Sequence, residues 1–192
     1  MRKVAFMKNC LGVTSVLTLL SACGGGGSDP YDNAQRYADL VGEAQVLSAS
    51  FEDADVTDVT SMPDAGSFTY NGVAGFRTDT SDFEYIATNP SIVGDAQFLV
   101  NFETGNLSGT ISKFVTSEGE AANGSVKIST GTIDDNLFTA SMTGALEADG
   151  EAAAVNASMV GAFMDEGARG MLGFVEGTVA DTSIWGVVGA AK

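Results

Sequence analysis

Apolar and polar positions alternate through the second two-thirds of the chain, a period that predicts β-strands. The first strand runs from about Ser67 to Phe76, and the last one surrounds Ile184. Between them we expect six more strands, joined mostly by short turns such as those near residues 104–106 and 134–136. Residues 83–87 form a short extra strand in this interpretation. Eight neighbouring strands favour an antiparallel up-and-down barrel, because that closure leaves no exposed edge.

Glycines lie within several of these strands, including Gly161, Gly173 and Gly186. Such positions suit tight bends of a barrel wall or large side chains that face them across the interior. The strands are short and show no continuous apolar band between two aromatic girdles. We therefore expect a soluble, tethered barrel with its aromatic side chains inside.

A helical repeat precedes the strands, from Asn33 to about Ser48. Its apolar residues recur at three- and four-residue steps: Ala34, Tyr37, Leu40, Val41, Ala44 and Leu47. We expect this stripe to pack against the barrel and to close one of its ends. An acidic loop follows over residues 52–65.

The N-terminal residues have the organisation of a secretory signal. Arg2, Lys3 and Lys8 give a basic start, and the apolar run Leu11–Leu20 follows. That run is shorter than the about 20 residues that span a bilayer. Four glycines at residues 24–27 then predict a flexible tether.

The tetrapeptide at residues 20–23, Leu-Ser-Ala-Cys, resembles the lipobox of bacterial lipoproteins. In that family a diacylglycerol is attached to the cysteine thiol, the signal is cut before the cysteine, and the new amine is acylated. The resemblance implies that Cys23 is lipidated and anchors the protein to a membrane. Gly24 after the cysteine implies transport to the outer membrane. The alternative is an unmodified, buried cysteine at the start of an ordinary helix.

Composition excludes several classes of site. The chain of 192 residues has 25 acidic and nine basic residues, a net charge of −16 and no histidine. It can therefore form neither a Ser-His-Asp triad nor a histidine-bearing zinc or haem site. Such an acidic chain binds nucleic acid poorly. Because Cys10 leaves with the signal, no disulfide can form within the mature chain, and packing must supply its stability.

Candidate metal and haem ligands have simpler structural interpretations. The acidic residues Glu52, Asp53, Asp55 and Asp58, like Asp79 and Asp82, do not follow a calcium-loop spacing and predict solvated loops. Iron could use Tyr70 and Tyr85, and haem could use Met142, Met159, Met164 and Met171, but packing explains tyrosines and methionines in strands more simply. No pair of carboxylates shares a buried face. We expect no metal, no cofactor and no enzymatic activity.

Residues 61–192 resemble the small barrels of transferrin-binding protein B. A Pro-x-x-Gly turn precedes a strand with Tyr-x-Gly at residues 63–72, and a later strand carries Ser-Gly at residues 108–109. Glycine-rich segments at 160–174 and 186–190 are similar to the closing hairpin of that family. The resemblance implies the fold and a surface lipoprotein, with a protein or iron carrier as partner. We transfer no binding residue from it.

These observations divide the chain into a signal peptide (1–22), a lipidated cysteine and tether (23–32), a helix with an acidic loop (33–60) and a barrel (61–192). We expect a monomeric lipoprotein anchored to the bacterial outer membrane, at the cell surface or on the periplasmic side, whose barrel binds an iron carrier or a solute. The alternatives are an adhesin-like or coat protein without a small ligand, and a barrel that captures haem or a metal through tyrosine or methionine. The side of the membrane stays open at this point.

Overall fold

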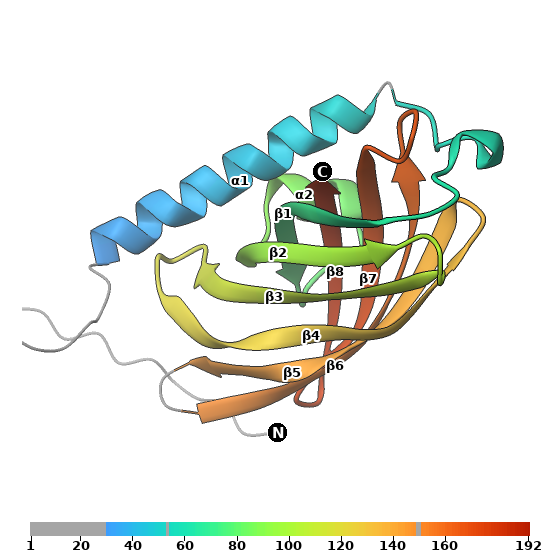
Figure 1. Cartoon of the computed structure of the whole chain (residues 1–192). Coiled ribbons are helices and arrows are strands. Elements are labelled where there is room, and N and C mark those ends of the chain that lie inside the picture. Colours follow the sequence, from blue (N-terminus) through green and yellow to red (C-terminus); the bar gives the residue numbers. More distant parts are fainter. Residues whose placement is uncertain (1–29, 53, 149–150) are drawn as a thin grey trace, which may run out of the picture.

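The structure is a computed structural model that describes residues 30–192, except residues 53 and 149–150. Eight strands follow one another along the chain and close into an antiparallel barrel (Figure 1). They are β1 (Ser67–Arg77), β2 (Ile92–Asn101), β3 (Asn106–Thr116), β4 (Ala121–Asp134), β5 (Leu137–Ala148), β6 (Glu151–Met164), β7 (Gly170–Val179) and β8 (Thr182–Ala191). β1 pairs with both β2 and β8, which closes the barrel. The predicted up-and-down barrel is confirmed.

Alternate residues of each strand point inward and form an apolar core. On β6 these residues are Val155, Met159 and Phe163, each at most 3% exposed. The predicted role of the glycines is also confirmed, because a Cβ at Gly161 or Gly186 would overlap an aromatic ring, of Phe138 or Phe76 respectively. Glycine thus makes the room into which the large core side chains fit.

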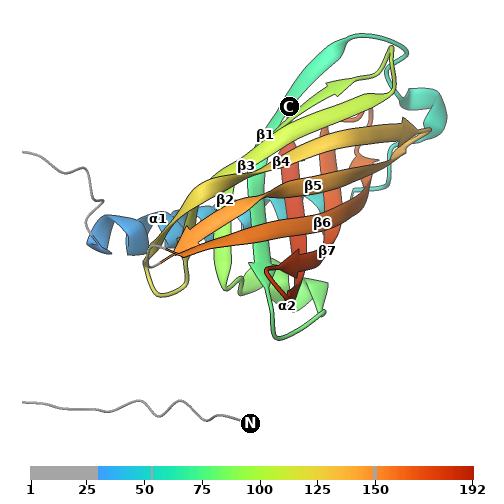
Figure 2. The same cartoon turned by 90° about the horizontal axis from the view of Figure 1, so that it is seen from below.

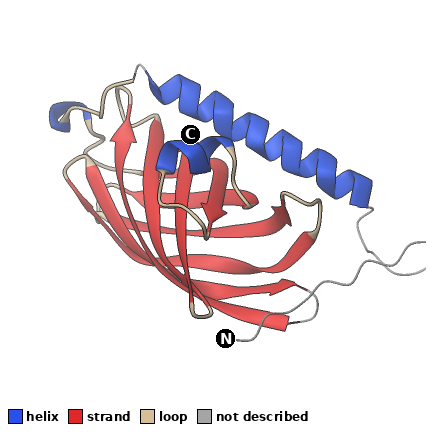
Figure 3. Ribbon diagram, turned by 180° about the vertical axis from the view of Figure 1, so that it is seen from behind, coloured by secondary structure: helices blue, strands red, loops and turns tan. Residues whose placement is uncertain are grey.

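The N-terminal helix, α1 (Pro30–Glu52), extends beyond the predicted range at both ends. It lies along the outer wall of the barrel (Figure 3), so the expectation that it closes one end is wrong. The reason is a second apolar cluster, in which Leu40 packs against the outward-facing Val73, Val93 and Val115 of three neighbouring strands. An ion pair of 2.9 Å between Arg36 and Asp95 also fixes the helix to the wall.

The segment between β1 and β2 corrects a second expectation. Residues 83–87 belong to the helix α2 (Phe83–Thr88), not to a strand. Asp82 caps this helix, since its side chain accepts a hydrogen bond of 3.1 Å from the backbone N–H of Tyr85. Asn89 precedes a proline, a position that disfavours the helical conformation and ends the helix. A single helical turn, η1 (Val59–Ser61), lies in the predicted loop between α1 and β1.

The helix α1 runs along the barrel from one end to the other. We call the end formed by the turns after β1, β3, β5 and β7 the open end, and the other the closed end. α1 begins at the open end, where Ala34 lies beside Gly119 of the β3–β4 turn, and it ends near Gly170 at the closed end. Figure 2 also shows the first turn of α1 next to the β3–β4 turn. The segment that precedes Pro30 therefore enters the structure at the open end.

Candidate functional site: an apolar cavity at the open end

Aromatic side chains fill the closed end of the barrel. The ring of Phe163 lies 5.2 Å from that of Phe102, 5.4 Å from that of Phe138 and 6.0 Å from that of Tyr70, measured between ring centroids. Outside this cluster, the ammonium group of Lys192 lies 4.1 Å from the centroid of Phe68. These rings fill the interior of the barrel at this end.

The segment between α1 and β1 seals the same end. The backbone N–H of Thr57 donates to the carbonyl oxygen of Phe163 at 2.8 Å, and its hydroxyl donates to that of Asp165 at 2.6 Å. The side-chain amide of Asn136 donates to the carbonyl oxygen of Thr57 at 2.7 Å. Thr57 is 2% exposed, so these bonds satisfy a buried polar residue and hold the segment across the end.

The buried hydroxyl of Tyr70 donates a hydrogen bond to the carbonyl oxygen of Ala168. Burial raises the pKa of this hydroxyl far above its ordinary value of 10.0. Above pH 10 the unfolded chain releases this proton while the folded protein keeps it, so Tyr70 makes stability fall as pH rises. Tyr70→Phe should lower the free energy of unfolding by about 1–2 kcal/mol at pH 7 and weaken its decline above pH 10.

Urea unfolding at pH 7 and at several pH values above 10 measures both effects. Tyr85→Phe is the matched control, because the Tyr85 side chain is 47% exposed. An equal loss of stability in both variants, with unchanged pH dependence, would contradict the role assigned to Tyr70.

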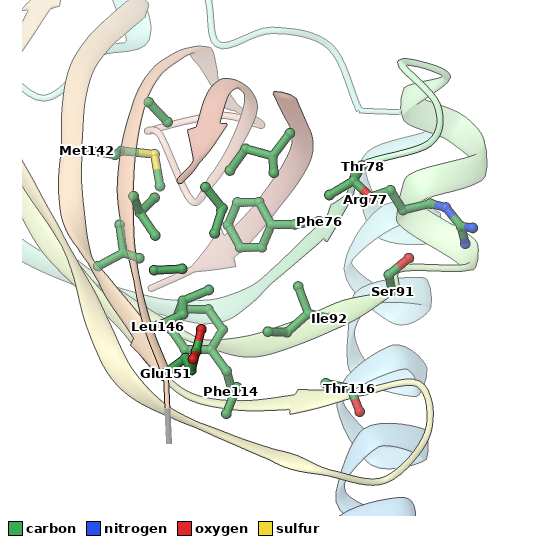
Figure 4. A pocket seen from close by; sticks show the side chains of 17 residues that line it. Phe76, Arg77, Thr78, Ser91, Ile92, Phe114, Thr116, Met142, Leu146 and Glu151 are labelled. Carbon is green, nitrogen blue, oxygen red and sulfur yellow. The ribbon is translucent and has the colours of Figure 1, made fainter. Parts of the chain in front are cut away.

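The open end contains an apolar cavity of about 390 Å³. Figure 4 shows Phe76, Phe114 and Met142 around it, with Ile92 and Leu146 nearer the mouth. Small residues of β6 complete the wall, among them Ala153 and Ala157. The volume lies within the range of about 300–1,000 Å³ that is usual for small-ligand sites. An aliphatic or aromatic molecule fits this lining, because the cavity offers it carbon atoms on every side.

Polar groups lie at the rim of the cavity: the hydroxyl groups of Thr78, Ser91 and Thr116 and the charged groups of Arg77 and Glu151. The guanidinium of Arg77 points away from the cavity (Figure 4) and binds both carboxylate oxygens of Asp79, at 2.6 and 2.7 Å.

Hydrogen bonding to Arg77 holds the pKa of the Asp79 carboxyl below its ordinary value, and the Arg77 pKa is raised in turn. The positive charge of the lining is thus already paired, whereas Glu151 is exposed. An uncharged occupant suits this rim better than an anion.

The acidic residues singled out in the sequence do not come together around a cation. Asp58 caps η1 through a 2.8 Å hydrogen bond from Thr60, Asp82 caps α2, and Asp79 binds Arg77. Asp55 is exposed in its loop. Glu52 ends α1, and Asp53 lies outside the described residues. Within the described part of the chain, no three acidic or cysteine side chains are grouped as a metal site.

The tyrosines and methionines considered as iron or haem ligands lie in the core or on the surface. Tyr70 belongs to the core, and Tyr85 lies on the surface with Arg77 4.9 Å from its ring centroid. The four methionines of the strands are buried: Met142, Met159, Met164 and Met171. Met142 differs from the other three because it lines the cavity. The sequence pattern indicates only a packing role for Met142 and gives no sign of the cavity.

Cys23, the predicted lipidation site, lies outside the described residues, as do the signal and most of the tether. Across residues 30–192, apart from the three undescribed positions, no helix is long and apolar enough to cross a membrane.

Comparison with known proteins identifies one family. The profile of the C-lobe and N-lobe β-barrels of transferrin-binding protein B matches residues 62–192. No curated protein matches the chain in sequence.

Three solved structures are similar to this chain. Intact Ap-TbpB, with its N and C lobes, is 22% identical over 71% of this chain, with a TM-score of 0.50. A variant of transferrin-binding protein B from Haemophilus parasuis Hp5 is 19% identical over 71% of the chain (TM-score 0.48), and a surface lipoprotein is 18% identical over 68% (TM-score 0.41). The chain spans 28% of the length of each of the first two and 63% of the third.

Proposed function

The chain belongs to the family of the C-lobe and N-lobe β-barrels of transferrin-binding protein B, and on this basis we propose that it is an outer-membrane lipoprotein whose barrel captures a small apolar solute. The anchor is the lipid on Cys23, and the binding site is the cavity at the open end. Membership of this family supports a role in binding and not in catalysis. The apolar lining of the cavity supports an apolar ligand.

One observation carries this proposal: the barrel is closed by aromatic packing at one end and hollow at the other. A barrel of eight strands is just wide enough for side chains to fill it or for one small ligand. Here Phe138 and Phe163 fill the closed end, whereas Ala153 and Ala157 leave about 390 Å³ at the open end. A cavity with this apolar lining favours binding of an apolar molecule.

Capture of an iron carrier and a coat-like role make a different prediction about the cavity. Either would use the outer surface and loops, so the cavity would have no ligand to bind. The transferrin-binding proteins that this chain resembles are longer, and this chain spans about 28% of their length. Binding at the cavity therefore separates solute capture from both alternatives.

The test is titration with the neutral fluorescent dye N-phenyl-1-naphthylamine. The full chain carrying Cys23→Ser serves as background, so that no acyl chain is attached. Ala153→Trp places an indole in the cavity and should weaken dye binding at least tenfold. Ala154→Trp is the matched control, because Ala154 is the next residue of β6 and is exposed on the opposite face of the wall.

Circular dichroism and thermal unfolding establish that both variants fold. Undiminished dye binding by a folded Ala153→Trp variant would contradict the proposal. So would the absence of saturable dye binding by the background protein.

A further inference from the structure

The chain that leads to the predicted anchor joins the barrel near the mouth of the cavity. α1 enters the structure at the open end, where Ala34 lies beside Gly119 in the β3–β4 turn. Thr116 and Ala122, which flank this turn, both line the cavity. The polypeptide that leads to Cys23 is therefore joined to the barrel at the rim of its mouth.

The connection is short enough to bring the anchor to the mouth. Pro30, the first residue of α1, is seven positions after Cys23, with six residues between them. Seven residues span at most about 25 Å when fully extended. Pro30 itself lies four residues, or about 6 Å of helix, from Ala34. A group carried by Cys23 thus reaches the mouth, and its effective concentration there is in the millimolar range that short linkers give.

The rim favours an uncharged lipid over a phospholipid. Arg77 is held by Asp79, and the carboxylate of Glu151 would repel a phosphate group. The hydroxyl groups of Thr78, Ser91 and Thr116 can instead bond to ester oxygens. The glycerol group of a lipoprotein anchor has ester-linked chains and no charge. Its ester oxygens can accept hydrogen bonds from the rim hydroxyl groups, and it needs no free cation at the rim.

We propose that the cavity holds one acyl chain of the protein's own lipid anchor on Cys23. This inference rests on the proposed function, because it requires lipidation of Cys23 and a cavity that accepts apolar molecules. The cavity, near the lower end of the range for ligand sites, has room for one chain and not for several. The other acyl chains of the anchor stay in the bilayer and keep the protein on the membrane. An external solute must then compete with the anchor for the same space.

The test is photo-cross-linking of the full lipoprotein in its own membrane. Two residues at the mouth line the cavity, Leu146 and Glu151, and each is replaced in turn by p-benzoylphenylalanine. Their chain neighbours Ala145 and Ala152 are exposed and serve as matched controls. Leu146 is already a large residue, and Glu151 is exposed, so its replacement keeps the test valid where the variant at position 146 does not fold.

Illumination should join position 146 or 151 to the acyl group on the Cys23 peptide within the same molecule, and mass spectrometry of the digest identifies the product. We expect at least tenfold more of this product from the cavity-lining positions than from the controls. Attachment of a phospholipid at the cavity-lining positions would overturn the assignment of the anchor as occupant and leave solute capture intact. Equal yields from cavity-lining and control positions would also overturn it.

The mass of the Cys23 peptide from the unilluminated protein distinguishes a failure of the lipidation proposal from a failure of the cavity assignment. An acyl mass on this peptide confirms the lipoprotein part of the proposed function independently of the cavity. Absence of that mass overturns both the anchor and the inference that depends on it. Dye binding by the Cys23→Ser chain reports on the cavity in either case.

Discussion

A leucine in place of Gly161 is expected to lower the free energy of unfolding by about 3 kcal/mol, the largest effect we predict for the barrel. A Cβ at this position would overlap the carbonyl oxygen of Leu172 and the ring of Phe138. Gly161 is also paired with Gly173 on the neighbouring strand, so two glycines together give Phe138 its space. The backbone of β7 cannot move aside as a flexible side chain would, and the strain stays in the barrel.

The measurement is thermal unfolding of the full chain, for which about 3 kcal/mol corresponds to a decrease in Tm of roughly 6–12 °C. Gly42→Leu is the matched control, because a Cβ at Gly42 in α1 would meet no atom within 4 Å. This control should unfold at or above the wild-type temperature, since leucine favours helix more than glycine does. A Gly161→Leu variant as stable as the control would show that β6 and β7 do not approach as closely as described.

Cys23→Ser should remove the protein from the outer membrane, the largest expected effect on its location. Each buried methylene of an acyl chain contributes about 0.8 kcal/mol, so the two or three chains of a lipoprotein anchor hold it effectively permanently. Serine has no thiol to accept the diacylglycerol, and the signal then remains uncut. Incorporation of a labelled fatty acid should fall to background.

Cell fractionation and intact mass measure this change. Cys10→Ser is the control, because Cys10 lies within the predicted signal and should be dispensable. Its product should be lipidated and membrane-bound like the wild type. Continued acylation of the Cys23→Ser chain, or loss of acylation in the Cys10→Ser chain, would contradict the assignment of Cys23.

The barrel could be predicted from the sequence because its inward residues alternate cleanly. On β6, Val155, Met159 and Phe163 fall on one face in any register of a period-two strand. α2 was missed because Phe83, Tyr85 and Ala87 alternate like a strand over a segment too short for a helical repeat. The cap formed by Asp82 was the available signal, and the proline at position 90 marks where the helix has to end.

The position of α1 could not be read from its own stripe. A helical stripe identifies the face that packs, but its partner surface is a property of the strands. The outward residues Val73, Val93 and Val115 form that surface, and they come from three strands that are adjacent in the folded barrel. Apolar residues at outward positions of neighbouring strands were the signal for a covered wall.

The cavity lay beyond sequence reasoning for a related reason. Its volume depends on whether side chains from opposite walls meet, which no single strand determines. The run of alanines at residues 152–154 was a partial signal, since it places small side chains on β6 near the open end. Met142 gave no such signal, because a buried methionine fits a filled core as well as a ligand site.

The central claim, that the open end of the barrel is a binding site, is tested most directly by the methyl resonances of methionine. The full chain carrying Cys23→Ser is labelled with ¹³C at its methionine methyl groups and titrated with N-phenyl-1-naphthylamine. Met142 lines the cavity, and Met171, which is 1% exposed and does not line it, is the internal reference. We expect a saturable shift of the Met142 resonance while that of Met171 stays in place. An unchanged Met142 resonance at saturating dye would contradict it.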